Sequence, residues 1–259
     1  MRLSRLSHSA STILRLACLI CICGIYSFAA TIPASTAIPV RFTHTIDSAH
    51  SKAGDIVTAQ TIQAISLPDG TSIARGAKVI GHVVDARPYA FDPTPYVKQT
   101  PSVLAIHFDR IVDHGVNTPL SVSLRAMADP ISSNAASSPT YAFEGDPLGT
   151  VILIGGDQYT PGTKYVYSDR DVVGYKRPHG VYARLIANDY IGSGVILHCY
   201  ATDTEQSVAL FSANACGLYG FDSIYLAVNG DESSGTFRLE SRHDSVKIYA
   251  GSAALLQVQ

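Results

Sequence analysis

Short runs of β-branched and aromatic residues, separated by glycine and proline, recur along most of this chain and restrict its fold more than any other feature. Residues 79–84 and 194–200 are typical of these runs. Such residues suit the pleated surface of a sheet, and no stretch keeps a helical period of 3.6 for more than two turns. The pattern predicts an all-β fold, a barrel or sandwich of many short antiparallel strands, in one domain or two.

Residues 37–87 form the most complete unit of this kind. Val40, Phe42 and Ile46 fall on one face of an extended chain, with polar residues between them. Further strands are expected at 56–62 and 79–84, with a proline-glycine turn at 67–71 between them. A glycine inside the last strand, Gly81, predicts a bulge or a close approach of another backbone.

The order of motifs in residues 37–87 resembles the barrel domain of TrbI-type periplasmic proteins of type IV secretion and conjugation channels. That family has a Ser-Asp loop, a Pro-Gly turn and the step I-P-x-G-[ST]-x-[LV]-[IL]-G. Residues 73–81, IARGAKVIG, match the step in part, with Ala74 at the position of the family's proline. The resemblance implies a β-barrel-like module. The mature chain also resembles uncharacterised secreted bacterial envelope proteins, which implies no particular chemistry.

Residues 1–30 have the pattern of a secretory signal peptide. Three arginines precede an apolar run, and small residues follow it, so cleavage is expected near Ala29 or Ala30, with Ala34 or Ala37 as alternatives. The apolar run is short for a membrane span of about 20 residues, and no later segment is apolar enough to be one. We therefore expect an exported protein, periplasmic, outer-envelope-associated or extracellular, without a transmembrane helix in the mature chain.

The charge balance limits the possible partners. The chain has 19 Lys+Arg and 21 Asp+Glu, and loss of the three signal-peptide arginines leaves 16 against 21, or −5. Nucleic acids and anionic lipids attract clustered Lys and Arg, so no nucleic-acid partner is expected. Envelope proteins or further copies of the chain remain as expected partners. With 46% apolar and 15% charged residues, the chain can bury a substantial core.

Cysteine usage agrees with export. Three of the five cysteines lie in the signal peptide, which leaves Cys199 and Cys216. In an oxidising compartment these two are expected to form a disulfide, with a stabilisation of about 3 kcal/mol. The alternative, a metal site that includes His198, lacks the paired spacing of a tetrahedral zinc site. No metal is therefore expected.

Two segments stand out as loops. Residues 88–96 contain three prolines and three aromatic residues, Tyr89, Phe91 and Tyr96, which are either a binding surface or a packed hairpin cap. Residues 129–147 are rich in Ser, Ala and Pro and are expected to be a linker or a long loop. This segment would separate a β-barrel-like domain at 37–128 from 148–259, a second β domain or a continuation of the first.

Two strand pairings can also be proposed from the turns. The strands at 102–112 and 120–126 are expected to form a hairpin across the turn 113–115. The strands at 224–228 and 236–240 are expected to pair across the Asn229-Gly230 turn.

Catalytic signals are weak. The motifs of nucleophile-elbow hydrolases, zinc proteases and aspartic proteases are absent, and no sequence pattern indicates a nucleotide or another cofactor. A histidine near acids could act as a general base with an orienting carboxylate. Two combinations are candidates: His107 or His114 with Asp109, and a loop-built site of His179 or His198 with Asp203 or Asp222.

The sequence therefore favours a non-catalytic exported β protein of the envelope or the medium, acting as an assembly or binding module. The alternative is a secreted hydrolase with a loop-built His/Asp site.

Overall fold

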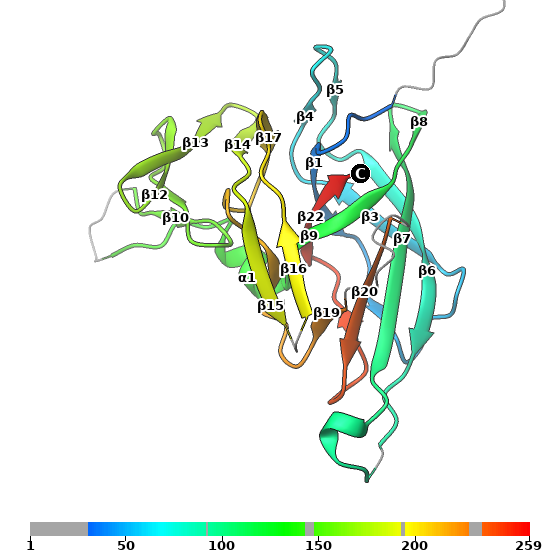
Figure 1. The fold of residues 1–259 in the computed structure, drawn as a ribbon. Coiled ribbons are helices and arrows are strands. Elements are labelled where there is room, and N and C mark those ends of the chain that lie inside the picture. The colour runs from blue at the N-terminus through cyan, green and yellow to red at the C-terminus, as the bar shows by residue number, and fades with distance from the viewer. Residues whose placement is uncertain (1–30, 92, 143–147, 193–194, 228–234) are drawn as a thin grey trace, which may run out of the picture.

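The computed structural model describes residues 31–91, 93–142, 148–192, 195–227 and 235–259. The fold is all-β, as predicted, with one large sheet and four smaller ones in these ranges (Figure 1). Its helical segments are α1 (Pro130–Ala135) and the 3₁₀ turn η1 (Tyr96–Lys98). Among the described residues, no helix has both the length and the apolar character required to cross a membrane.

The large sheet curls into a nearly closed barrel (Figure 1). In spatial order its strands are β18 (Gly217–Tyr219), β9 (Val122–Ala128), β22 (Ala253–Val258), β1 (Ala37–Phe42), β3 (Ile56–Thr61), β6 (Lys78–Arg87), β7 (Ser102–Asp113), β20 (Thr236–Ser241) and β19 (Tyr225–Ala227), and β8 (Val116–Pro119) also pairs with β7. The pairs are antiparallel, as expected, except that β18 runs parallel to β9.

The unit expected at residues 37–87 forms as predicted. Val40, Phe42 and Ile46 are all buried. The proline-glycine turn joins β4 (Ile65–Ser66) to β5 (Ser72–Ile73), and Gly70 takes a φ of 84°, which a side chain would strain. Alternation and turn chemistry were therefore sufficient to locate these strands.

Gly81 shows both features expected of a glycine inside a strand. The register between β6 and β7 shifts between Ile80 and Gly81, which marks a bulge. A Cβ atom at this position would overlap with the carbonyl oxygen of His107 on β7. The absence of a side chain therefore permits the close approach of the two backbones.

The remaining strands form smaller sheets. One six-stranded sheet contains β10 (Val151–Ile152), β11 (Gln158–Tyr159), β12 (Tyr165–Ser168), β13 (Asp171–Arg177), β14 (Gly180–Arg184) and β17 (Glu205–Ser207). The other pairs are the hairpin of β15 (Asn188–Gly192) with β16 (Val195–Cys199), and β2 (Ile46–Asp47) with β21 (Lys247–Ile248). The large sheet thus takes strands from both sides of residues 129–147, and the six-stranded sheet lies beside it (Figure 1).

One of the two expected hairpins is wrong. The turn at 113–115 leads from β7 into the short strand β8, whereas β9 pairs with β22 and β18. Sequence proximity favoured β9 as the partner of β7. In the structure β9 pairs instead with β22, a strand that is buried along its whole length. The pairing of β19 with β20 is confirmed, and its expected Asn229-Gly230 turn lies outside the described residues.

Residues 129–147 were expected to be a linker or loop, but part of this segment is helical. The carboxylate of Asp129 accepts the backbone N–H of Ser132 at 2.7 Å and so caps α1. Ser133 is buried, and its hydroxyl accepts the N–H of Ala253 on β22 at 3.2 Å. Residues 143–147 lie outside the described part of the chain.

Two apolar cores share strand β22. Ala254 and Leu256 point into the barrel, whereas Ala253 and Leu255 pack with Phe211 on its outer side, beneath the six-stranded sheet. Every residue of β22 is buried, so both faces of this part of the large sheet are covered.

Candidate functional site

The barrel leaves one gap in its wall, between β9 and β19. Strand β18 pairs only with Ala126–Ala128 of β9, and β19 pairs only with β20 among the described strands. The first half of β9 therefore has no hydrogen-bonded strand on its outer edge. Ser123, Leu124 and Arg125 from this half line a cavity that is also lined by Leu226 and Ala227 of β19.

This cavity has a volume of about 810 Å³. Six strands each contribute an apolar side chain to its wall: Val84, Leu124, Leu197, Leu226, Phe237 and Val258. The lining also includes uncharged polar residues, namely Ser35, Ser123, Thr236, Gln257 and Gln259. A site of this volume that combines apolar side chains with polar groups is typical of small-molecule binding.

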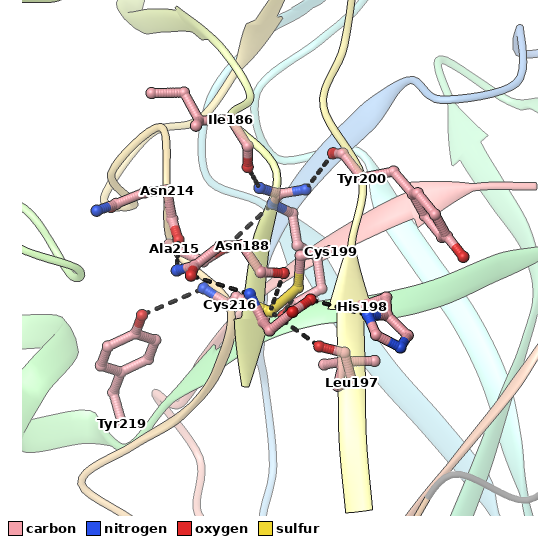
Figure 2. Close-up of a disulfide and its surroundings, with 12 residues drawn as sticks. Ile186, Asn188, Leu197, His198, Cys199, Tyr200, Asn214, Ala215, Cys216 and Tyr219 are labelled. Carbon is pink, nitrogen blue, oxygen red and sulfur yellow. Dashed lines mark hydrogen bonds and ion pairs between the residues drawn. A yellow bond between two sulfur atoms is a disulfide. The ribbon is translucent and has the colours of Figure 1, made fainter. Parts of the chain in front are cut away.

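The β15–β16 hairpin forms one wall of the cavity, since Leu197, His198 and Cys199 of β16 line it. A disulfide joins Cys199 to Cys216, just before β18, with a Cα–Cα separation of 6.0 Å (Figure 2). This geometry fits the pairing expected from the sequence. The disulfide therefore links the β15–β16 hairpin to the segment that leads into β18 of the barrel.

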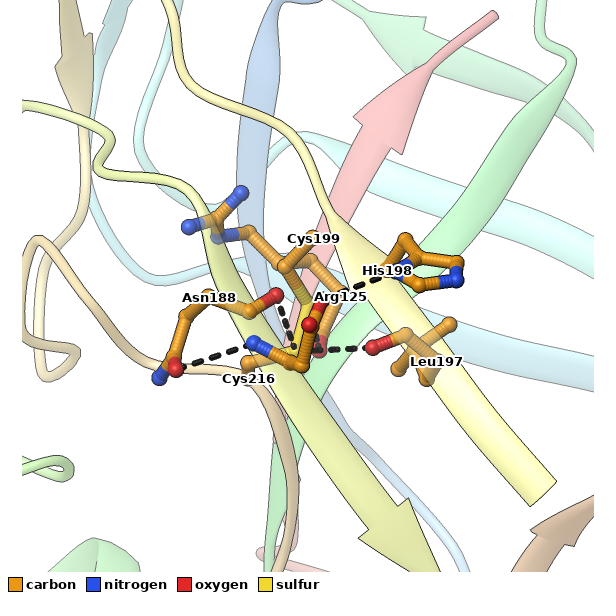
Figure 3. A network of polar contacts seen from close by, with 7 residues as sticks. Arg125, Asn188, Leu197, His198, Cys199 and Cys216 are labelled. Carbon is orange, nitrogen blue, oxygen red and sulfur yellow. Dashed lines mark hydrogen bonds and ion pairs between the residues drawn. A yellow bond between two sulfur atoms is a disulfide. The ribbon is translucent and has the colours of Figure 1, made fainter.

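The disulfide is packed among backbone carbonyl groups (Figure 3). The Cys199 sulfur lies 3.5 Å from the Arg125 carbonyl oxygen, and the Cys216 sulfur lies 3.7 Å and 3.8 Å from those of Asn188 and Leu197. These are packing contacts, because a disulfide sulfur carries no hydrogen to donate. The sulfurs thus contact both strands of the hairpin as well as β9.

Arg125 holds the same region together by hydrogen bonds. Its side chain is 2% exposed, and Nε donates to the carbonyl of Ala215 at 3.0 Å. One terminal nitrogen donates to Tyr200 at 2.6 Å, and the other donates to Ile186 at 2.6 Å and to Ala213 at 3.3 Å. Burial lowers the pKa of Arg125 to about 10, so the group stays charged at neutral pH.

The other charged groups of the cavity already have partners. Arg238 contacts Asp85 at 3.1 Å and Glu240 at 2.7 Å. His198 contacts Asp189 at 2.8 Å, and both of these side chains are more than half exposed. Arg238 and His198 are thus in ion pairs, whereas the charge of Arg125 contacts backbone carbonyls.

The predicted aromatic residues lie elsewhere. Tyr89, Phe91 and Tyr96 lie in the connection between β6 and β7, and none of them lines the cavity. Phe91 is 81% exposed and Tyr96 is 52% exposed, so neither is a packed cap residue. The backbone N–H of Tyr89 donates to the hydroxyl of Ser245 at 3.0 Å. A binding role for these residues stays a prediction.

The first predicted histidine group is assembled in part. His107 Nε2 lies 3.9 Å from Asp109, and His82 of the neighbouring strand lies 3.0 Å from the same carboxylate. His114 instead contacts Asp113 at 2.8 Å, within the turn at 113–115. Sequence reasoning missed His82, although its position opposite His107 follows from the β6–β7 register.

The second predicted group is not assembled. His198 contacts Asp189, its cross-strand neighbour, instead of Asp203 or Asp222. His179, Asp203 and Asp222 are exposed. Within the described ranges, no three or more His, Cys, Asp or Glu side chains are grouped to hold a metal ion.

Comparison of the chain with protein-family models, with curated proteins and with solved structures finds no match.

Proposed function

We propose that this protein is a non-catalytic, exported binding module of the bacterial envelope or of the medium, and that the cavity at the barrel gap is its ligand site. The observation that carries the proposal is the apolar wall built from six strands around about 810 Å³. A cavity of this size can enclose most of the surface of a small apolar ligand.

Several features support export and an envelope role. The pattern of residues 1–30 is that of a signal peptide, and a disulfide suits an oxidising compartment. The resemblance of residues 37–87 to TrbI-type barrel domains supports envelope proteins or further copies of this chain as partners.

Filling the cavity tests the proposal. The neutral fluorescent probe N-phenyl-1-naphthylamine is expected to bind saturably, at one site per chain. Ala227 is half-buried on β19 and lines the cavity, so Ala227→Trp places an indole ring in the apolar space. We expect the affinity for the probe to fall by about tenfold or more, equivalent to about 1.4 kcal/mol, in a fluorescence titration.

The matched control is Ala90→Trp, which adds the same ring to an exposed position in the β6–β7 connection. This variant is expected to bind the probe like the wild type. Equal affinities for the two tryptophan variants, or no saturable binding by the wild type, would remove the cavity as the ligand site.

One observation favours the alternative, a secreted hydrolase. The hydroxyl of Thr236 lies 3.4 Å from His107 Nδ1, and Asp109 lies on the other side of that ring. This order matches a nucleophile, a base and an orienting acid, although the 3.4 Å and 3.9 Å contacts are long for proton transfer. Such a site would be built on strands rather than on loops.

The two functions differ in their response to His107→Ala. For the binding module, we expect no turnover of ester, peptide or polysaccharide substrates above the blank, and unchanged probe affinity in this variant. His114→Ala serves as the control, because His114 contacts Asp113 at the surface. Turnover by the wild type and His114→Ala that is lost in a folded His107→Ala variant would assign a hydrolase instead.

A further inference from the structure

A row of tyrosines crosses three neighbouring strands of the six-stranded sheet, in the part of the molecule farthest from β6 and β7 (Figure 1). Tyr165 on β12 is paired with Tyr175 on β13, which is paired with Tyr182 on β14. Val166 and Ala183, which alternate with these tyrosines, are buried in the core. The tyrosines therefore lie on the outer face of this sheet.

The outer part of the row is open to solvent. Tyr165 is 44% exposed and Tyr175 is 41% exposed, and their ring centroids lie 5.9 Å apart. Tyr167 adds a third ring, 6.3 Å from Tyr165. Tyr182 is covered by the guanidinium of Arg177, which lies 4.9 Å from its ring centroid. Tyr182 itself is 6% exposed, so the face presents the rings of Tyr165 and Tyr175 beside the Arg177 cation.

Positive charge gathers beside these rings. A shallow depression of about 260 Å³ is lined by Tyr175 together with Lys164, Lys176, Arg177 and Glu205. Lys176 alternates with Tyr175 along β13 and points to the other face, where its ammonium lies 4.9 Å from the Tyr159 ring centroid. Arg177 forms an ion pair with Glu205, and Lys164 forms no ion pair with a described residue. Because the whole chain has a net charge of −2, the positive charge of Lys164 is local to the tyrosine face.

We propose that this face binds an anionic polysaccharide, one whose sugar units carry carboxylates, at a site separate from the cavity. Tyrosines offer flat, rigid, amphipathic rings, on which the apolar faces of sugars can pack. Lys164 is exposed and would pair with a sugar carboxylate, whereas Arg177 keeps its ion pair with Glu205 at the end of the tyrosine row.

The charge of the chain favours this ligand over nucleic acid. A nucleic acid also stacks on aromatic rings, but its dense phosphates require many clustered cations. This face has Lys164 and the ion-paired Arg177 on a chain that is acidic overall. The open and shallow shape of the depression suits an extended polymer, which lies across a surface rather than inside a pocket.

Polygalacturonate is the probe, and isothermal titration calorimetry at low salt measures its binding. We expect the Tyr165→Ala, Tyr175→Ala double variant to bind about tenfold more weakly, since each ring contributes a modest stacking term. Lys164→Gln is expected to weaken binding and to reduce its salt dependence. Tyr249→Ala is the control, because Tyr249 is 52% exposed and lies just after β21, outside the six-stranded sheet.

Three results would overturn the inference. They are equal affinity in the double variant and in Tyr249→Ala, equal binding of fully methyl-esterified polygalacturonate, and binding of single-stranded DNA in place of the polysaccharide. Thermal unfolding of each variant identifies any loss that arises from misfolding. Because the cavity probe is measured separately, failure here leaves the proposed function untouched.

Discussion

Replacement of Arg125 by methionine is expected to lower the free energy of unfolding by about 4 kcal/mol, measured by urea denaturation at neutral pH. Methionine fills a similar volume but has no donors. The carbonyls of Ala215, Tyr200, Ile186 and Ala213 would lose the hydrogen bonds that Arg125 donates to them. A buried acceptor without its donor costs about 1–3 kcal/mol, and relaxation toward water recovers part of the sum.

The matched control is Arg110→Met, at an exposed position on β7. This substitution is expected to change the free energy of unfolding by about 0.5 kcal/mol or less. Arg125→Lys keeps the charge but cannot reach four carbonyls, so it should recover only part of the loss. Equal stability of Arg125→Met and Arg110→Met would show that the four hydrogen bonds are energetically unimportant.

Removal of the disulfide has the second largest expected effect. The Cys199→Ser, Cys216→Ser double variant is expected to lose about 3 kcal/mol of stability, because its unfolded chain regains the freedom of a loop with a sequence separation of 17. We also expect weaker binding of the cavity probe, since the β16 wall then loses its covalent link to Cys216. Denaturant titrations and the probe titration measure the two effects.

Reduction of the wild type offers an independent comparison. Dithiothreitol should lower the stability of the wild type to that of the double variant and leave the double variant unchanged. If the double variant is as stable as the oxidised wild type, the cross-link contributes nothing to folding.

The fold was predictable wherever the information is local. Alternation located β1 and β3, and the turn residues located the reversal at Gly70. The prediction failed where pairing depends on distant strands. Nothing near β9 indicates that its partner is β22, more than 120 residues later, instead of β7. Helix α1 was missed because a six-residue helix lacks the periodicity that a pattern requires.

The site was less predictable than the fold. Arg125 lies within a strand that was expected, but its four acceptors are 61 to 90 residues away in loops without any motif. The cavity arises because β18 covers only half of β9, which depends on strand lengths in three dimensions. By contrast, the cysteines could be paired from the sequence, since only two remained after the signal peptide was excluded.

The position of β22 has a consequence for how the chain reaches its native state. This strand comes last in the described sequence but lies inside the large sheet, between β1 and β9. During synthesis, β1 can gain this neighbour only after the other strands of the large sheet have emerged from the ribosome. Completion of the sheet is thereby delayed, and such non-local pairing is slow. Until β22 is in place, β1 and β9 each leave one strand edge unpaired, and such edges favour pairing with other chains.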